Sequence, residues 1–117
     1  MTQMVNSGIQ PLQNLYTLRL IEAFGNDPAM WAGHHIARGL AAMERMAEPI
    51  SGTYLVGDQI TVADMCLIPQ LYNARRYNIP LQSFPTLCRV EEACSQHPAF
   101  QAAVPEAQHD APDGSNV

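Results

Sequence analysis

The hydrophobic residues of this 117-residue chain recur at helical spacing through its first half. Apolar positions three to four residues apart predict one long amphipathic helix over residues 4–24. Pro11 lacks a backbone donor, so a kink is expected near residue 9. Asp27 and Pro28 then form an N-cap followed by a proline at the first helical position, which predicts a second helix over residues 28 to about 48. Its inward stripe is predicted to comprise Ala32, Ile36, Leu40, Met43 and Ala47.

The middle of the chain combines a loop with a strong helix start. Residues 50–60 contain two glycines and no helical period, which predicts an ordered loop, with a short strand over 54–56 as the alternative. Thr61 and Asp64 have the spacing of a capping box, and both are interpreted as structural helix-cap residues. The helix expected over 62–74 is apolar almost all round, which predicts a central position in the domain, and Pro69 predicts a bend.

The end of the chain predicts two further helices, over residues 85–96 and 98–103, each starting at a proline. The segment after residue 104 is polar and contains prolines, which favours a tail without a core of its own. The predicted fold is therefore all-α, a bundle of about five helices. Residues 1–104 are expected to form one helical domain, and residues 105–117 an extended or flexible C-terminal tail.

Composition restricts the classes of partner. Six arginines, no lysines and eleven acidic residues give a net charge of −5, which disfavours nucleic acid as a ligand. No apolar run approaches the roughly 20 residues that cross a bilayer, and no signal peptide is evident, so a cytoplasmic protein without membrane contact is expected. Only 15% of residues are charged, which suggests that some apolar surface meets a partner.

The cysteines and histidines offer no metal site. The three cysteines lack the spacing of a zinc site and are expected to be free thiols. The adjacent His34 and His35 would point about 100° apart on a helix, so they are poorly placed to hold one ion.

Several segments together resemble zeta-class glutathione transferases, the family of maleylacetoacetate isomerases and their maleylpyruvate-isomerising relatives. The segments are GIQPLQNL at 8–15, VGDQITVADMCLIPQ at 56–70, NARRY at 73–77, FPT at 84–86 and HPAFQAA at 97–103. The resemblance spans nearly the whole chain and implies the C-terminal helical domain of such a transferase. The thioredoxin-like domain that activates glutathione in this family has no counterpart here, so the sequence is expected to be either a cut enzyme or a free-standing remnant.

The resemblance also implies site residues. Gln10, Asn14, Leu15 and Tyr16 correspond to positions beside glutathione, often that of the neighbouring subunit, although the family usually has a small or basic residue where Tyr16 stands. Gln10 and Asn14, four residues apart, are expected to share a helix face. Arg76 corresponds to the residue that holds a substrate carboxylate. Without the resemblance, this arginine would as readily be read as a solvated helix end.

The function implied is the substrate-binding half of a glutathione-dependent maleylacetoacetate or maleylpyruvate cis–trans isomerase. Whether the chain is itself an enzyme is open: it has no residue assignable to thiol activation, so alone it is expected to be inactive and to bind glutathione weakly. Its expected partners are a small dicarboxylate substrate, a second copy in a homodimer, and the absent thioredoxin-like domain or another protein. The alternative is a non-enzymatic helical dimerisation or interaction module derived from the same family.

Overall fold

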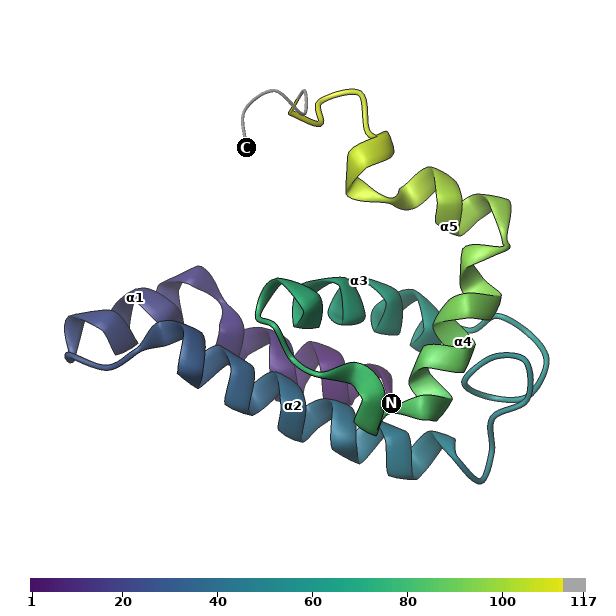
Figure 1. Cartoon of the computed structure of the whole chain (residues 1–117), viewed down its shortest axis with the longest axis horizontal. Coiled ribbons are helices and arrows are strands. Elements are labelled where there is room, and N and C mark those ends of the chain that lie inside the picture. The colour runs from purple at the N-terminus through teal and green to yellow at the C-terminus, as the bar shows by residue number, and fades with distance from the viewer. Residues whose placement is uncertain (113–117) are drawn as a thin grey trace.

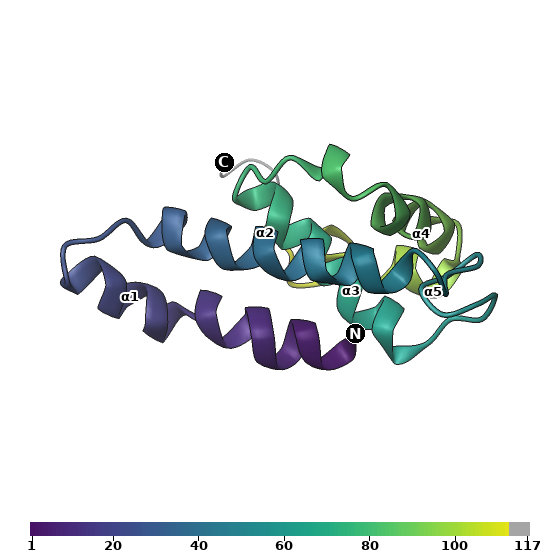
Figure 2. The ribbon, with the colours of Figure 1, turned by 90° about the horizontal axis from the view of Figure 1, so that it is seen from below.

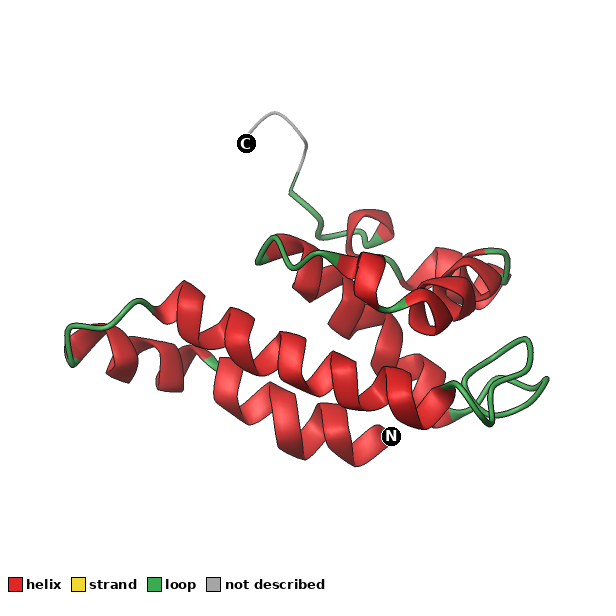
Figure 3. Cartoon of the chain, turned by 60° about the horizontal axis from the view of Figure 1, so that its bottom comes forward, coloured by secondary structure: helices red, strands yellow, loops and turns green. Residues whose placement is uncertain are grey.

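The computed structural model describes residues 1–112, in which helices and loops are present and no strand is formed (Figures 1 and 3). The predicted all-α bundle with five α-helices is therefore confirmed. The α-helices are α1 Leu15–Ala23, α2 Pro28–Ala47, α3 Val62–Arg76, α4 Pro85–Ser95 and α5 Pro98–Ala103. Shorter segments are a π-helical turn at Met4–Ile9 and 3-10 turns at Gln10–Gln13, Leu81–Ser83 and Pro105–Ala107.

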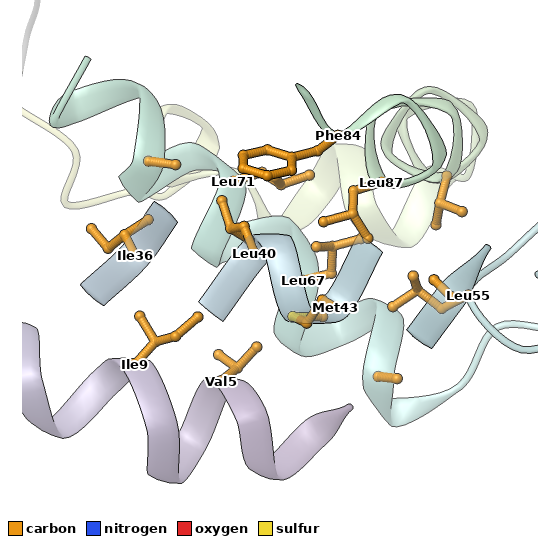
Figure 4. Packing of buried hydrophobic residues seen from close by; sticks show 14 of the residues in the cluster. Val5, Ile9, Ile36, Leu40, Met43, Leu55, Leu67, Leu71, Phe84 and Leu87 are labelled. Atoms are coloured by element: carbon orange, nitrogen blue, oxygen red, sulfur yellow. The ribbon is translucent and has the colours of Figure 1, made fainter. Parts of the chain in front are cut away.

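Helix α2 is the long central element of the bundle. The N-terminal segment, residues 1–14, and α1 run along one side of it, and α4 lies on the opposite side (Figures 1 and 2). Helix α3 passes behind α2 in the view of Figure 2 and contacts both the N-terminal segment and α4. Helix α5 continues from α4 and packs chiefly against that helix. The core forms where α2, α3, α4 and the π-helical turn meet (Figure 4). The predicted inward stripe of α2 is confirmed, because all five of its residues are completely buried.

A glycine on α2 permits the close approach of the N-terminal segment. Ile9 is fully buried, and a methyl group placed on Gly39 would overlap Cγ1 and Cδ1 of the Ile9 side chain. Any larger residue at position 39 would therefore push the segment away from α2 or force Ile9 out of its place. The sequence periodicity does not reveal this contact, because a glycine in a helix ordinarily reads only as a weak position.

The prediction of one N-terminal helix over residues 4–24 is wrong. The chain is π-helical to Ile9 and forms a 3-10 turn through Gln13, and Asn14 is extended with ψ 144°. The helix type changes after Ile9, where a kink is expected. The second break, at Asn14, changes which residues of α1 face the core. Consequently Leu15 and Tyr16 are exposed, at 69% and 72%, instead of continuing the buried stripe. Pro11 removes a donor, and the Asn14 side chain accepts a hydrogen bond from the Tyr16 amide, so both residues favour the new helix start.

The cap of α3 also anchors the preceding loop. Thr61 and Asp64 form the predicted capping box, and Oδ2 of Asp64 accepts hydrogen bonds from the Thr61 amide at 2.7 Å and the Thr61 hydroxyl at 3.0 Å. Asp64 is fully buried, and its Oδ1 accepts a hydrogen bond from the Leu55 amide at 2.9 Å. The expected loop over 50–60 is confirmed, and the alternative strand over 54–56 is not formed. One carboxylate thus joins the loop to the core helix.

The expected central position of α3 holds for one face of the helix only. One face is buried against α2, α4 and the N-terminal segment. Val62, Met65 and Tyr72, on the remaining surface of α3, are exposed by 60%, 57% and 40%. The reason is that α5 covers this face only in part, and a groove remains between the two helices. The high apolar content of α3 therefore reflects a core face together with an uncovered apolar face.

Helices α4 and α5 end within one residue of their predicted limits. Helix α4 has no cap from its own preceding residue. Instead, the Glu44 carboxylate on α2 accepts hydrogen bonds from the Thr86 and Leu87 amides at 2.9 and 3.0 Å. After α5 the chain makes the 3-10 turn at Pro105–Ala107 and is described to residue 112. The rest of the predicted tail, residues 113–117, lies outside the described residues.

Candidate functional site

An apolar groove of about 450 Å³ lies between α3 and α5. It is lined by Ile60, Met65, Ile68, Pro69, Tyr72, His97, Ala99, Phe100, Ala103, Val104 and Pro105. Its polar groups include the Tyr72 hydroxyl, which donates a 2.8 Å hydrogen bond to the Glu106 carboxylate. This hydrogen bond raises the pKa of Tyr72 and lowers the pKa of Glu106. The groove is thus suited to an apolar occupant and has a charged group beside it.

The two arginines at the end of α3 have different surroundings. Both Arg75 guanidinium nitrogens donate to the Glu91 carboxylate at 2.6 Å, a two-pronged ion pair that raises the pKa of Arg75. Arg76 is exposed, and its side chain makes no hydrogen bond or ion pair with residues 1–112. It follows Tyr72 by four residues and therefore lies on the groove side of α3. Arg76 is the arginine of the pair that is available to an anionic ligand.

The predicted glutathione-side residues occupy one short segment, at the break before α1. Gln10 is exposed, and its Nε2 donates a 3.0 Å hydrogen bond to Oε1 of Gln70. The Asn14 side chain is used as the N-cap of α1, through a 3.0 Å hydrogen bond from the Tyr16 amide. The expectation that Gln10 and Asn14 share a helix face is wrong, because the 3-10 turn and the extended Asn14 interrupt the helix between them.

Sequence reasoning missed Gln13 and Gln70 at this segment. Gln70 on α3 is fully buried, and its Nε2 donates to Oε1 of Gln13 at 3.3 Å. A signal was present in the sequence, because Gln70 is a polar residue in a run that otherwise supplies the apolar core helix. The nearby Trp31 indole donates a 2.9 Å hydrogen bond to the Leu12 carbonyl and holds the same segment from α2.

Helix α3 connects the two parts of the site. Gln70 and Arg76 are six residues apart, which places them about 9 Å apart along the helix and about 120° apart around it. One face of the helix therefore holds the N-terminal segment, while another presents Arg76 beside the groove. The predicted site residues thus form two neighbouring groups on either side of the core helix and do not converge on one cavity.

No group of three or more histidine, cysteine, aspartate or glutamate side chains that could hold a metal ion is present among residues 1–112. The cysteines Cys66, Cys88 and Cys94 are free, and burial raises the pKa of Cys94 to about 11. Burial also raises the pKa of Cys88. Both thiols are therefore protonated at neutral pH.

None of the helices formed by residues 1–112 has the length and the apolar character that a membrane span requires.

Comparison with known proteins gives consistent relatives. Residues 34–98 match the model of the family "Glutathione S-transferase, C-terminal domain". The chain is 43% identical over 110 residues to probable maleylacetoacetate isomerase 2 of Drosophila melanogaster, covering 94% of this chain and 48% of that protein.

Solved structures agree with this relationship. Maleylacetoacetate isomerase from Anaeromyxobacter dehalogenans, with bound dicarboxyethyl glutathione and citrate in the active site, has a TM-score of 0.92 and 49% identity. That match covers 96% of this chain and 53% of the isomerase. A maleyl pyruvate isomerase described as a bacterial zeta-class glutathione S-transferase has a TM-score of 0.89 and 35% identity, over 95% of this chain and 55% of its own. The chain thus spans about half the length of the relatives that it matches.

Proposed function

The chain belongs to the glutathione S-transferase C-terminal domain family, in its zeta-class and maleylacetoacetate isomerase group, and we propose that it is the substrate-binding half of a glutathione-dependent cis–trans isomerase. The substrate is a small maleyl dicarboxylate, with maleylacetoacetate and maleylpyruvate as the two candidates. Bound glutathione would supply a thiolate that adds reversibly to the maleyl double bond, so that this bond can rotate and glutathione is regenerated when the carbon–sulfur bond breaks. In this chain, Arg76 would hold one carboxylate of the substrate. Gln10, Asn14, Leu15 and Tyr16 would lie beside the glutathione.

The observation that best supports this proposal is the difference in pairing between the side chains of Arg75 and Arg76. Arg75 is held by Glu91, whereas Arg76 is exposed and unpaired among the described residues. A guanidinium matches a carboxylate with two parallel hydrogen bonds. Arg76 can therefore hold one carboxylate of the substrate while the central bond rotates. Its fixed place at the end of α3 provides orientation, which lowers the entropic cost of reaching the reactive geometry.

The segment from Gln10 to Tyr16 forms part of the glutathione surround in this proposal. The side-chain oxygen of Gln10 and the Nδ2 group of Asn14 make no hydrogen bond with residues 1–112. These groups can accept and donate hydrogen bonds to a peptide-like ligand. Leu15 and Tyr16 are exposed beside them and offer apolar contact. The relative solved with bound dicarboxyethyl glutathione carries both glutathione and a dicarboxylate in one ligand, which supports neighbouring sites for the two.

The remaining contacts of the protein are assigned to its exposed apolar surfaces. The α3–α5 groove is proposed to seat the thioredoxin-like half that activates the glutathione thiol. Phe24 and Met30, which are 72% and 70% exposed, are proposed to meet a second copy of the chain. Light scattering is expected to give a dimeric mass, and a monomer at high concentration would contradict this assignment.

The cytoplasm is the proposed location of the protein, because the three free cysteines suit a reducing compartment.

Paired arginine variants test the function. In the chain joined to a zeta-type glutathione-binding half, Arg76→Ala is expected to lower kcat/KM for the dicarboxylate by roughly 10- to 150-fold, since a charge-assisted hydrogen-bonded contact contributes about 1.5–3 kcal/mol. Arg75→Ala is the matched control and should have a much smaller effect. Glutathione conjugation of a neutral electrophile should be nearly unchanged in both variants. Equal losses in the two variants, or an equal loss for the neutral substrate, would show that Arg76 is not the carboxylate anchor.

A further inference from the structure

Two polar side chains are completely buried in the described part of the chain, Asp64 and Gln70. Asp64 is accounted for by the cap of α3 and the anchored loop. Gln70 caps no helix and meets no loop. Its amide lies between Gln10 and Gln13 of the N-terminal segment, receiving a hydrogen bond from Gln10 at 3.0 Å and donating one to Gln13 at 3.3 Å. No buried side-chain polar atom among these residues lacks a partner.

The fold itself does not require an amide at this position. Gln70 is preceded by a turn of α3 that buries Leu67 and is followed by buried Leu71, so an unbranched apolar side chain of similar length would suit the same surroundings. Gln10 is exposed and Gln13 is half-buried, so water could satisfy both amides if Gln70 were apolar. An apolar residue would therefore cost the fold little. The amide is better explained by what it does to its two partners.

The donor and acceptor roles in these two hydrogen bonds determine which side-chain groups of Gln10 and Gln13 remain available to a ligand. Gln10 uses its NH₂ group toward Gln70, so its carbonyl oxygen remains for a ligand. Gln13 uses its carbonyl oxygen, so its NH₂ group remains. One end of the chain of amides therefore presents an acceptor and the other end a donor. A peptide-like ligand carries the complementary pair, an N–H group and a carbonyl or carboxylate oxygen.

We propose that Gln70 is a positioning residue for the glutathione surround, which orients the side-chain amides of Gln10 and Gln13 from within the core, and that Gln13 joins Gln10 as a contact for the peptide part of the ligand. This proposal rests on the proposed function for the identity of the ligand. Gln70 touches no ligand itself. It acts through the two outer glutamines, whose rotamers it restricts before the ligand arrives, and this lowers the entropic cost of binding.

The first test needs no ligand. Side-chain amide hydrogen exchange is measured by NMR in the full chain, with the exposed Gln59 as the reference because it makes no hydrogen bond with residues 1–112. We expect the NH₂ groups of Gln10 and Gln70 to retain a hydrogen that exchanges about tenfold more slowly than those of Gln59. Exchange as fast as in Gln59 would refute the arrangement in the wild-type chain, without any variant having to fold.

The second test uses Gln70→Met, which keeps the length of the side chain and removes both hydrogen bonds. Leu71→Val is the control for a small loss of core packing at the adjacent position. Both variants are made in the chain joined to a zeta-type glutathione-binding half, and glutathione affinity is measured by isothermal titration calorimetry. We expect the Kd to rise about tenfold in Gln70→Met and to stay near wild type in Leu71→Val. The thermal midpoint of Gln70→Met should be no lower than that of Leu71→Val.

The outcomes separate this proposal from the proposed function. If wild type binds glutathione and Gln70→Met binds it equally well, or if Leu71→Val loses as much affinity, Gln70 is only a core residue. If the joined wild-type protein binds glutathione no more tightly than the glutathione-binding half alone, the proposed contribution of this chain to the glutathione surround is contradicted. In that case amide exchange decides whether Gln70 orients the two glutamines: accelerated exchange at Gln10 in Gln70→Met supports the orienting role, and unchanged exchange overturns it.

Discussion

Asp64→Ala should lower the free energy of unfolding of the domain more than Thr61→Ala, which changes the other residue of the capping box. The carboxylate is fully buried and accepts hydrogen bonds from the backbone amides of Leu55 and Thr61, at 2.9 and 2.7 Å, and from the Thr61 hydroxyl. A hydrogen bond to a charged group contributes about 1.5–3 kcal/mol. Loss of the two amide contacts alone should therefore cost about 3–6 kcal/mol. This is a large part of the 5–15 kcal/mol typical of a domain.

Two milder variants set the scale for this loss. Thr61→Ala removes one hydroxyl contact and the cap, and should cost about 0.5–2 kcal/mol. Asp64→Asn keeps an acceptor oxygen but turns an NH₂ group toward one of the donors, so an intermediate loss is expected. The free energy of unfolding is measured by urea denaturation, followed by far-UV circular dichroism. If Asp64→Ala costs no more than Thr61→Ala, the contact between Asp64 and the loop contributes nothing to stability, and the reasoning is wrong.

Two further changes test the packing of α2 and its titration. Gly39→Ala should lower the free energy of unfolding by about 1–3 kcal/mol, because the added methyl overlaps Ile9. Gly33→Ala should cost less, because its methyl would meet only the end of the Ile79 side chain. Urea denaturation measures the free energy of unfolding of both variants. Burial, together with neighbouring basic groups, lowers the pKa of His35 below 6.5, so the unfolded chain binds a proton more readily and stability should fall as pH drops through about 6.5. Thermal midpoints measured across this range should decline less in His35→Gln, and equal declines would contradict this contribution.

Local signals allowed much of the helical framework to be predicted. The N-cap and proline at Asp27 and Pro28 place the start of α2, and the capping box places the start of α3, because these residues act on amides only two or three positions away. The buried stripe of α2 follows from the 3.6-residue period. The bounds of α4 and α5 follow in the same way from the prolines that begin them.

Contacts between distant residues could not be predicted in this way. Glu44 caps a helix more than forty residues later in the chain, and Gly39 matters because Ile9 lies against it. The break at Asn14 depends on a balance between Pro11 and the new cap, which periodicity alone does not measure. Exposed apolar side chains on α3 also share the hydropathy of buried ones. Only the position of α5 shows which face of α3 is left uncovered.

For the candidate site, the sequence indicated single residues more readily than their arrangement. The family resemblance favours Arg76 over Arg75, and the ion pair between Arg75 and Glu91 supplies a physical reason for that preference. The same resemblance indicates Gln10. Its link through Gln70 to Gln13 depends on two segments about sixty residues apart and could not be read from local spacing.

The central claim is that this chain supplies substrate binding and depends on a second, glutathione-activating half. The most direct measurement compares glutathione-dependent isomerisation of maleylacetoacetate and maleylpyruvate by the 117-residue chain alone, by a zeta-type glutathione-binding half alone, and by the two joined. We expect turnover above the uncatalysed rate only in the joined protein. Turnover by the chain alone, or a joined protein that is folded by circular dichroism and binds glutathione but isomerises neither substrate, would contradict the account.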